Sequence, residues 1–152
     1  MELSIIRAIL NYQFGDKVGD KLIENYKDKI KIEISKRTGR IRRIYIDGKL
    51  FGTVEPSTGF IIPTMFGGEI LKKYLDFPKY RVIIEDEAIE FVKKGKSVFC
   101  KFVIDAYDQI LSGDIVFVVD KNDNLIAIGE SLLSSKEIKD FKRGVAVKIK
   151  NV

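Results

Sequence analysis

The second half of the chain is a succession of short apolar segments, each closed by a glycine or an aspartate. The segments cover 81–84, 97–103, 112–120, 125–131 and 143–150. Short strands at regular spacing, with turn residues between them, are typical of a small β-barrel or β-sandwich. One amphipathic helix is expected within 85–96. Residues 79–152 are therefore expected to form a small domain that is mostly β.

The first half of the chain begins with a helical pattern. Apolar residues at helical spacing predict one helix over 3–11, broken at 12–15, and a second over 17–29. Asp16 stands directly before the second helix and is a favoured residue type for an N-cap. A third helix is expected over 66–75, after a proline that ends a strand.

Between the second and third helices the hydrophobic period becomes two, which is typical of half-buried strands. Ile30, Ile32 and Ile34 alternate with charged or polar neighbours. Turns that contain glycine then separate three more apolar segments. The four strands are expected over 29–35, 41–47, 50–54 and 60–62. These segments predict a four-stranded antiparallel meander accompanied by three helices.

A domain boundary is expected at Asp76-Phe77-Pro78, because Pro78 interrupts regular structure and a new pattern starts at Tyr80. The sequence thus divides into residues 1–78 and residues 79–152. A chain of 152 residues has room for one or two small domains. The predicted fold class is α+β, with an N-terminal α+β domain that contains an antiparallel sheet and a C-terminal β domain.

The composition excludes several kinds of catalytic and metal site. The chain has no histidine, and Cys100 is its one cysteine. A Ser-His-Asp triad, a Cys-His pair, a zinc site built on histidine or on several cysteines, and an intrachain disulfide are therefore excluded. Cys100 lies in an apolar pattern and is expected to be a small buried residue. No catalytic residue, metal site or cofactor is predicted.

The charge is compatible with a polyanionic partner. The chain carries 27 Lys and Arg against 22 Asp and Glu. Residues 1–78 hold 14 cations and 10 acids, whereas residues 79–152 hold 13 and 12. The second half must therefore gather its cations on one face if it is to bind a polyanion.

The sequence also bears on the protein's location and source. No apolar run reaches the roughly 20 residues that span a bilayer, so a cytoplasmic protein without membrane contact is expected. Frequent Lys, Glu and Ile are typical of proteins from thermophiles.

The densest cationic cluster lies at the first hairpin. Its five cations fall within eight residues that include no acid, and they are Lys36, Arg37, Arg40, Arg42 and Arg43. Because side chains alternate along a strand, Arg40 and Arg42 are expected on one face and Arg43 on the other. Arginine forks match phosphate oxygens, so Arg40 and Arg42 are candidates for contacts with RNA. The alternative is a solvated hairpin tip without a ligand.

The order of segments in the second half resembles a PUA domain, an RNA-binding pseudobarrel. The resemblance rests on the helix DEAIEFVKKGK, the segments SVFCKFV, GDIVFVVD and LIAIGESLL, and the closing GVAVKI, in this order. It implies a C-terminal PUA-type β pseudobarrel. In that family the first helix, the strand after it and the last strand form the RNA-binding face. The residues that this implies are Gly95, Lys96, Phe99, Lys101, Arg143, Gly144, Ala146 and Lys148.

Two features of these segments bear on the predicted face. Gly95 is expected to be the glycine that ends the helix. Along 143–150, alternation is expected to place Ala146 and Lys148 on the basic face, opposite a face that packs in the core. Gly144 and Ala146 are also small enough for another backbone to approach closely.

The first half resembles the small domain that precedes the PUA domain in archaeal tRNA-guanine transglycosylases and in archaeosine synthase. The resemblance rests on the segments YQFG, SKRTGRIRRIYIDG, PSTGFIIPT and GGEILKKYL. Those enzymes also contain a catalytic barrel with its nucleophile and metal ligands, which this sequence lacks. The resemblance therefore implies a non-catalytic RNA-binding protein whose RNA is tRNA. It also implies action in trans with the catalytic subunit of a tRNA-modifying enzyme.

Two other functions remain open from the sequence. One is a standalone enzyme, in which the acidic residues of 85–90 would form a paired-carboxylate site. The same acids suit a helix N-terminus with Asp86 as its N-cap. Gly67-Gly68, expected just before a helix, is a weak phosphate-binding signal. The other function is a protein–protein adaptor with a PUA-like fold, which an apolar patch at the predicted basic face would favour.

Overall fold

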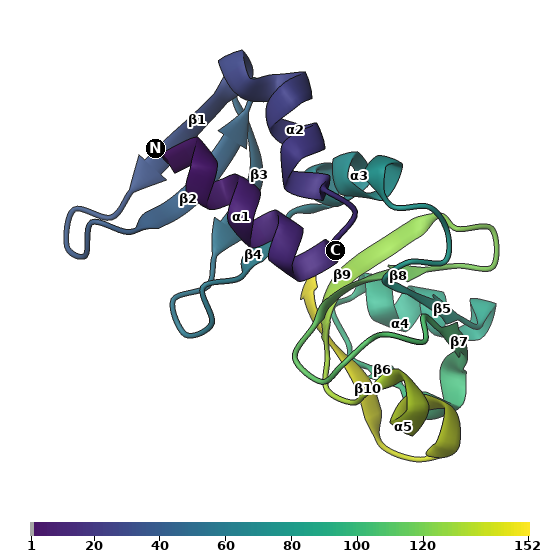
Figure 1. The fold of residues 1–152 in the computed structure, drawn as a ribbon. Coiled ribbons are helices and arrows are strands. Elements are labelled where there is room, and N and C mark those ends of the chain that lie inside the picture. Colours follow the sequence, from purple (N-terminus) through teal and green to yellow (C-terminus); the bar gives the residue numbers. More distant parts are fainter. Residues whose placement is uncertain (1) are drawn as a thin grey trace. The chain divides into compact units, whose positions relative to one another are not determined.

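The computed structural model describes residues 2–152 and divides the chain into two compact units, each with its own sheet (Figure 1). The division falls between Leu75 and Asp76, three residues before the boundary expected from the sequence. Within residues 2–152, every helix is too short or too polar to cross a membrane.

The N-terminal unit is an antiparallel meander with three α-helices, as the sequence predicts. Its strands pair in the order β1-β2-β3-β4. Its elements are α1 (Glu2–Phe14), α2 (Val18–Tyr26), the 3-10 helix η1 (Lys27–Lys29), β1 (Ile30–Ile34), β2 (Ile41–Ile46), β3 (Lys49–Val54), β4 (Ile61–Pro63) and α3 (Met65–Tyr74).

Helix α1 is longer than expected and continues to Phe14. The extension is stabilised by Gln13, whose buried side-chain amide pairs with the main chain of edge strand β4. Its Nε2 donates to the carbonyl oxygen of Ile61 at 3.0 Å, and the Ile61 N–H donates to its Oε1 at 2.6 Å. An amide can thus satisfy an unpaired strand edge inside a domain.

Two predictions about glycines and caps in this unit are wrong. Asp16 is not the N-cap of α2: it lies in the left-handed region at φ 51°, and Lys17 precedes the helix without a side-chain cap. Gly67 and Gly68 lie inside the first turn of α3 rather than before it. A Cβ at Gly67 would overlap the carbonyl oxygen of Phe51, so the glycine is needed for close packing of α3 on β3. The phosphate-binding hypothesis for this glycine pair is therefore withdrawn.

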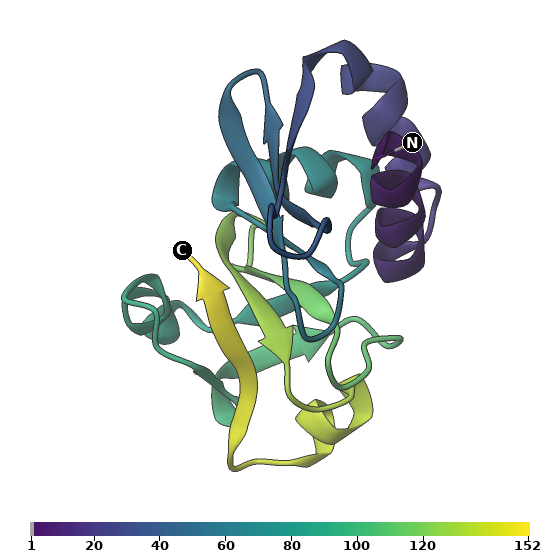
Figure 2. The ribbon, with the colours of Figure 1, turned by 90° about the vertical axis from the view of Figure 1, so that its left-hand side faces the viewer.

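The C-terminal unit has one six-stranded sheet with the order β6-β10-β9-β8-β5-β7. Strand β5 pairs parallel with β8, and the other pairs are antiparallel. Figure 2 shows β10, in yellow, beside β9. The elements are β5 (Arg81–Ile84), η2 (Asp86–Ala88), α4 (Ile89–Lys93), β6 (Val98–Phe99), η3 (Cys100–Phe102), β7 (Val103–Ala106), β8 (Ile115–Val119), β9 (Leu125–Ser131), α5 (Ser135–Asp140) and β10 (Val145–Asn151).

The segment 97–103, expected as one strand, is divided into two strands by η3. Strands β6 and β7 are the two ends of the sheet order, yet only the three residues of η3 separate them in the sequence. The turn therefore carries the chain from one edge of the sheet to the other, as a pseudobarrel requires. Cys100 is buried in this turn, as predicted.

A second correction concerns the start of the helical segment. Glu85, rather than Asp86, is the N-cap residue of η2, and it makes no side-chain capping bond. Asp86 is the first residue of η2 itself.

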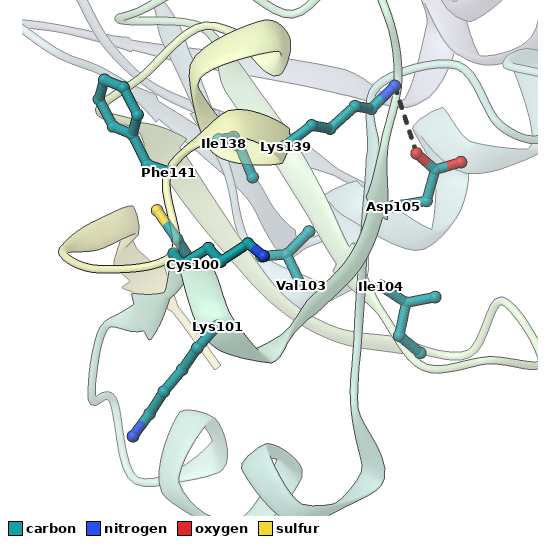
Figure 3. A pocket seen from close by; sticks show the side chains of 9 residues that line it. Cys100, Lys101, Val103, Ile104, Asp105, Ile138, Lys139 and Phe141 are labelled. Carbon is teal, nitrogen blue, oxygen red and sulfur yellow. Dashed lines mark ion pairs between the residues drawn. The ribbon is translucent and has the colours of Figure 1, made fainter.

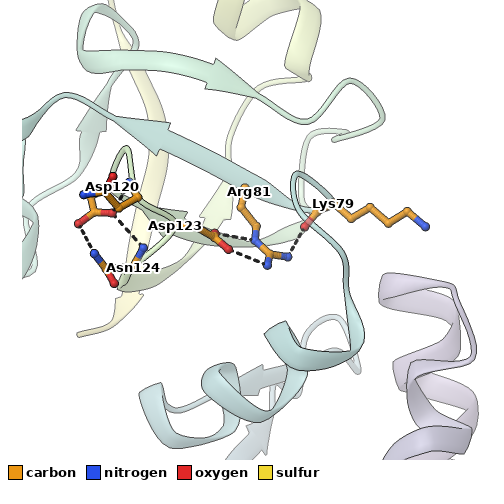
Figure 4. Close-up of polar contacts among 6 residues, drawn as sticks. Lys79, Arg81, Asp120, Asp123 and Asn124 are labelled. Carbon is orange, nitrogen blue, oxygen red and sulfur yellow. Dashed lines mark hydrogen bonds and ion pairs between the residues drawn. The ribbon is translucent and has the colours of Figure 1, made fainter.

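The start of β5 is fixed by a buried ion pair (Figure 4). The Arg81 side chain is 3% exposed, and its guanidinium donates to both carboxylate oxygens of Asp123 at 3.0 and 3.2 Å. It also donates to the Lys79 carbonyl at 2.9 Å and lies 5.9 Å from the Phe117 ring centre. Asp123 belongs to the turn between β8 and β9. The pair therefore ties this turn to β5.

Candidate nucleic-acid interface

Pairing of β6 with β10 brings together several residues predicted to bind RNA. Phe99 lies opposite Val145, and the Cys100 N–H donates to the Gly144 carbonyl at 2.9 Å. Lys101 directly follows Cys100 in η3, and Arg143 directly precedes Gly144, before β10 begins. Residues from positions about 40 apart in the sequence thus meet at one end of the β6–β10 pair.

Lys148 lies on the same face of this pair as Phe99. Val98 and Val147 are opposite each other and both are buried. Because side chains alternate along a strand, the next residues, Phe99 and Lys148, point away from the core. Both are exposed.

Ala146 does not lie on this outer face. The register between β10 and β6 shifts between Val145 and Val147, and this bulge breaks the expected alternation. The side chain of Ala146 is 0% exposed and belongs to the hydrophobic core. Among the small residues proposed here for close approach, only Gly144 is open to solvent, at φ 93°.

Gly95 ends α4, as predicted, in a geometry that uses the main-chain donors of the loop. Its N–H donates to the Val92 carbonyl at 2.8 Å, and the Lys96 N–H donates to the Phe91 carbonyl at 3.2 Å. This is the Schellman arrangement, which requires a residue with positive φ, here 86°. Because the N–H groups of Gly95 and Lys96 are already bonded within the protein, the loop can contact a ligand through the Lys96 side chain but not through these N–H groups.

An aromatic pocket of about 330 Å³ lies beside Lys96, between α4 and β6. Three phenylalanines line it, and two of them are half-exposed: Phe91 at 54% and Phe99 at 46%. Lys96 and Ser97 also line the pocket, and the Lys101 ammonium lies 5.0 Å from the ring centre of Phe102. Exposed aromatic faces beside lysines can stack with an unpaired base and contact its phosphate.

Sequence analysis identified only part of this pocket. It named Phe99, Lys96 and Lys101 through the family resemblance but missed Phe91 and Phe102. Both fit an apolar pattern that normally indicates core residues, and their exposure depends on how α4 packs. The one signal in the sequence was that Phe91 lies two and three positions before Lys93 and Lys94, at the end of the helix.

Four of the cations predicted to bind RNA are not neutralised by the described residues. Lys96, Lys101, Arg143 and Lys148 form no ion pair with any of residues 2–152. By contrast, Lys150 lies 3.5 Å from Glu130. Uncompensated cations attract a polyanion without first breaking an internal salt bridge.

The N-terminal unit carries a separate cationic hairpin between β1 and β2. Arg43 is ion-paired with Glu33, which lies opposite it in the sheet. Lys36, Arg37, Arg40 and Arg42 are exposed and form no ion pair with residues 2–152. Arg40 and Arg42 line one groove of about 210 Å³, which the β3–β4 loop completes. The predicted pair thus shares a concave surface.

Three titratable groups of the C-terminal unit have shifted pKa values. Burial raises the pKa of the Cys100 thiol and that of Asp114. A hydrogen bond to Asp108 raises the pKa of Lys139. Among residues 2–152, no three Cys, His, Asp or Glu side chains come close enough to hold a metal ion.

Both halves of the chain match known families. Residues 4–78 match the patch-forming domain C2 of tRNA-guanine transglycosylase, and residues 80–152 match the PUA domain. The chain is also 42% identical over 149 residues to a tRNA-guanine(15) transglycosylase of Methanococcus vannielii. That alignment covers 98% of this chain but 22% of the relative, so the chain spans about a fifth of the length of the curated relatives it matches.

Solved structures share the fold. A hypothetical protein from the hyperthermophilic archaeon Pyrococcus horikoshii OT3 superposes with a TM-score of 0.77 at 26% identity, over 99% of this chain and 89% of that one. A chain from an H/ACA RNP bound to a substrate RNA containing 2'-deoxyuridine superposes with a TM-score of 0.51 at 26% identity. This second match covers 55% of this chain and 25% of the other. The resemblances to the PUA domain and to the domain that precedes it in archaeal tRNA-guanine transglycosylases are confirmed.

Proposed function

We propose that this chain, whose residues 4–78 match the patch-forming domain C2 of tRNA-guanine transglycosylase and whose residues 80–152 match the PUA domain, is a non-catalytic tRNA-binding protein. The observation that carries the proposal is the aromatic pocket with uncompensated lysines beside it. The fold that part of the chain shares with a chain of an H/ACA RNP bound to a substrate RNA supports the same conclusion.

The proposed interface combines two kinds of contact. Lys96, Lys101, Arg143 and Lys148 neutralise phosphates, which supplies affinity that depends little on sequence. The aromatic pocket accepts a base that is free to leave a helix, because bases in an A-form helix are hidden in a deep, narrow major groove. We therefore propose binding at a junction between paired and unpaired tRNA. Arg40 and Arg42 add phosphate contacts from the N-terminal unit.

The proposed role is that of an accessory subunit. The chain aligns with about a fifth of each transglycosylase, and the aligned part corresponds to its C2 and PUA domains. We propose that it acts in trans with the catalytic subunit of a tRNA-modifying enzyme, for which it holds the tRNA. We expect such a subunit to co-purify with the chain when tRNA is present. After nuclease treatment we expect the subunit to be absent.

Charge reversal tests the proposed interface. The double variant Lys96→Glu/Lys148→Glu is expected to weaken tRNA affinity by more than tenfold, because it places two repulsive charges on the face. The control is Lys121→Glu/Lys136→Glu, which changes net charge equally at two exposed lysines elsewhere in the unit and also removes the exposed ion pair of Lys121 with Glu85. Equal weakening by both variants would contradict the assigned face. Circular dichroism establishes that both variants are folded.

The adaptor function is a second candidate, favoured by the exposed rings of Phe91 and Phe99. An adaptor would use these rings as an apolar contact for a protein. In that case Phe99→Ala would abolish binding to the partner protein. tRNA binding would be undetectably weak in the wild-type chain and equally weak in Lys96→Glu/Lys148→Glu. The lysines without ion pairs beside the rings favour RNA.

A further inference from the structure

We propose that the chain forms a dimer through strand β1, whose open edge pairs antiparallel with β1 of a second copy. This inference goes beyond the proposed function and does not depend on it, because β1 contains none of the residues assigned to RNA. Figure 1 shows β1 at the end of its sheet, with β2 on one side of it. The pairing joins the N-terminal sheets of two copies into one continuous sheet.

Within residues 2–152, the other sheet edges are covered or short. The β4 edge is closed by the side-chain amide of Gln13. The β7 edge is covered by α5: Lys139 lies 3.3 Å from Asp105 (Figure 3), and the Ser135 hydroxyl donates to the Ala106 carbonyl at 3.0 Å. Strand β6 has two residues. An edge strand with unpaired N–H and C=O groups is a ready template for pairing with another chain, and β1 is such a strand.

The main-chain groups of alternate β1 residues face the open edge. At one end of β1 the Lys29 carbonyl accepts from the Asp47 N–H at 3.0 Å, and at the other end the Ser35 N–H donates to the Arg40 carbonyl at 2.8 Å. Because residues along an antiparallel strand bond to the neighbouring strand alternately, the odd-numbered residues of β1 bond to β2. The residues whose N–H and C=O groups point away from β2 are therefore Ile30, Ile32 and Ile34.

The bulge between β1 and β2 leaves this alternation intact. Glu33 lies opposite Arg43 and Ile34 lies opposite Ile41, so the extra residue, Arg42, belongs to β2. In a symmetric antiparallel pairing, Ile32 lies opposite Ile32 of the second copy, and each Ile30 lies opposite an Ile34. Residues paired in this way exchange two hydrogen bonds. The open groups of β1 are thereby satisfied without any change in the strand.

Charge selects this register among those that the main chain allows. The side chains of Lys31 and Glu33 share one face of β1. When Ile32 lies opposite its copy, Lys31 of each chain lies opposite Glu33 of the other. Sliding the strands by two residues would place Lys31 opposite Lys31, or Glu33 opposite Glu33, and like charges directly opposite each other are destabilising. A slide by one residue would oppose residues whose main-chain groups already bond to β2.

Both charges are available to a second chain. Lys31 is exposed and forms no ion pair with any of residues 2–152. Arg43 bonds to Oε2 of Glu33, so Oε1 can accept from Lys31 of the second copy. The pairing also buries apolar surface, because Ile34 is 40% exposed and Ile30 of the second copy covers it.

Sedimentation equilibrium of the nuclease-treated full chain tests the proposal. The wild-type chain is expected to change from one copy to two as its concentration rises. Lys31→Glu and Glu33→Lys each place like charges opposite each other and should weaken association about tenfold or more. An equimolar mixture of the two variants regains opposite charges at both positions, so dimers are expected to return. A loss of folding in either variant could not produce this recovery.

The matched controls are Lys21→Glu and Glu24→Lys, which make the same charge changes at exposed positions of α2 in the same unit. Each control is expected to associate as the wild-type chain does.

Disulfide cross-linking tests the register. The thiols introduced by Lys31→Cys in one chain and Glu33→Cys in another are expected at a Cα–Cα distance of about 4.5 Å, which a disulfide can bridge. A mixture of the two variants should cross-link under mild oxidation, whereas each variant alone should not. Cys100 is buried and does not compete.

Four results would overturn the proposal. They are a chain that stays monomeric at every concentration, a dimer that Lys31→Glu and Glu33→Lys leave unchanged, a mixture of these variants that stays monomeric, and cross-linking of Lys31→Cys with itself. If the chain is monomeric and Lys31→Glu instead abolishes binding to a catalytic subunit, the edge serves that subunit and the second-copy assignment fails. Because nucleic acid is absent from these assays, their results leave the test of tRNA binding separate.

Discussion

The buried Arg81–Asp123 pair gives a prediction whose magnitude follows from the structure. The variant Asp123→Asn removes the negative charge but keeps a residue type that tolerates the positive φ of 63°. The Arg81 guanidinium, 3% exposed, then loses the charge of the Asp123 carboxylate. Breaking a buried pair in this way costs about 3–5 kcal/mol. Because Asp123 is itself 31% exposed, water replaces part of the lost interaction, and we expect the low end, about 3 kcal/mol.

Cys100 provides the assay for this prediction. It is the one cysteine of the chain and is buried in the same unit, so its reaction with a thiol reagent in urea reports unfolding of that unit. A loss of about 3 kcal/mol lowers the urea midpoint by about 1–3 M. The control is Lys121→Ala in the same turn, whose ion pair with Glu85 at 3.7 Å is exposed. Exposed pairs contribute about 0–1 kcal/mol. Equal urea midpoints for the two variants would refute the stabilising role assigned to the Arg81–Asp123 ion pair.

Three further predictions concern the packing and the caps. Gln13→Ala leaves the buried N–H and C=O of Ile61 without their Gln13 partner and is expected to cost about 2–4 kcal/mol in urea unfolding. Asn25→Ala, which removes an exposed hydrogen bond, is expected to cost less than about 1 kcal/mol. Gly67→Ala forces α3 away from β3 and should cost about 2 kcal/mol or more, and a neutral result would show that the helix can shift freely. The backbone N–H of Ser134 holds the pKa of Glu137 below its ordinary value of 4.5. The stability that it provides is therefore present above pH 4.5 and lost as the pH falls through the folded-state pKa, so Glu137→Gln should flatten this part of the acid unfolding profile.

The sequence predicted the element order of both units because the hydrophobic period changes clearly between helices and strands. Its errors lie where tertiary contacts decide the local structure. The segment 97–103 is apolar apart from Ser97 and Lys101 and contains no glycine or proline, so nothing in its pattern revealed the turn that sends β6 and β7 to opposite ends of the sheet. Helix α1 continues past its expected end because Gln13 forms hydrogen bonds with Ile61 in β4, which is distant in the sequence.

Prediction of the candidate interface was limited by the same physics. Lys96, Lys101 and Lys148 were found through the resemblance, and the structure leaves each of them exposed and without an ion pair. Ala146 was misplaced because a bulge cannot be read from alternating residues. The exposure of Phe91, and with it the aromatic pocket, depends on the packing of a five-residue helix. Such a property becomes visible only in three dimensions.

The most direct test of RNA binding is a titration of total tRNA against the intact chain at a series of salt concentrations. Six cations are assigned to phosphates: Arg40, Arg42, Lys96, Lys101, Arg143 and Lys148. If all six release counter-ions, the logarithm of the binding constant should fall with the logarithm of salt concentration with a slope of roughly −4 to −5. Lys96→Glu/Lys148→Glu should reduce the magnitude of this slope by about 2. A flat salt response, or no binding at low salt, would contradict the account.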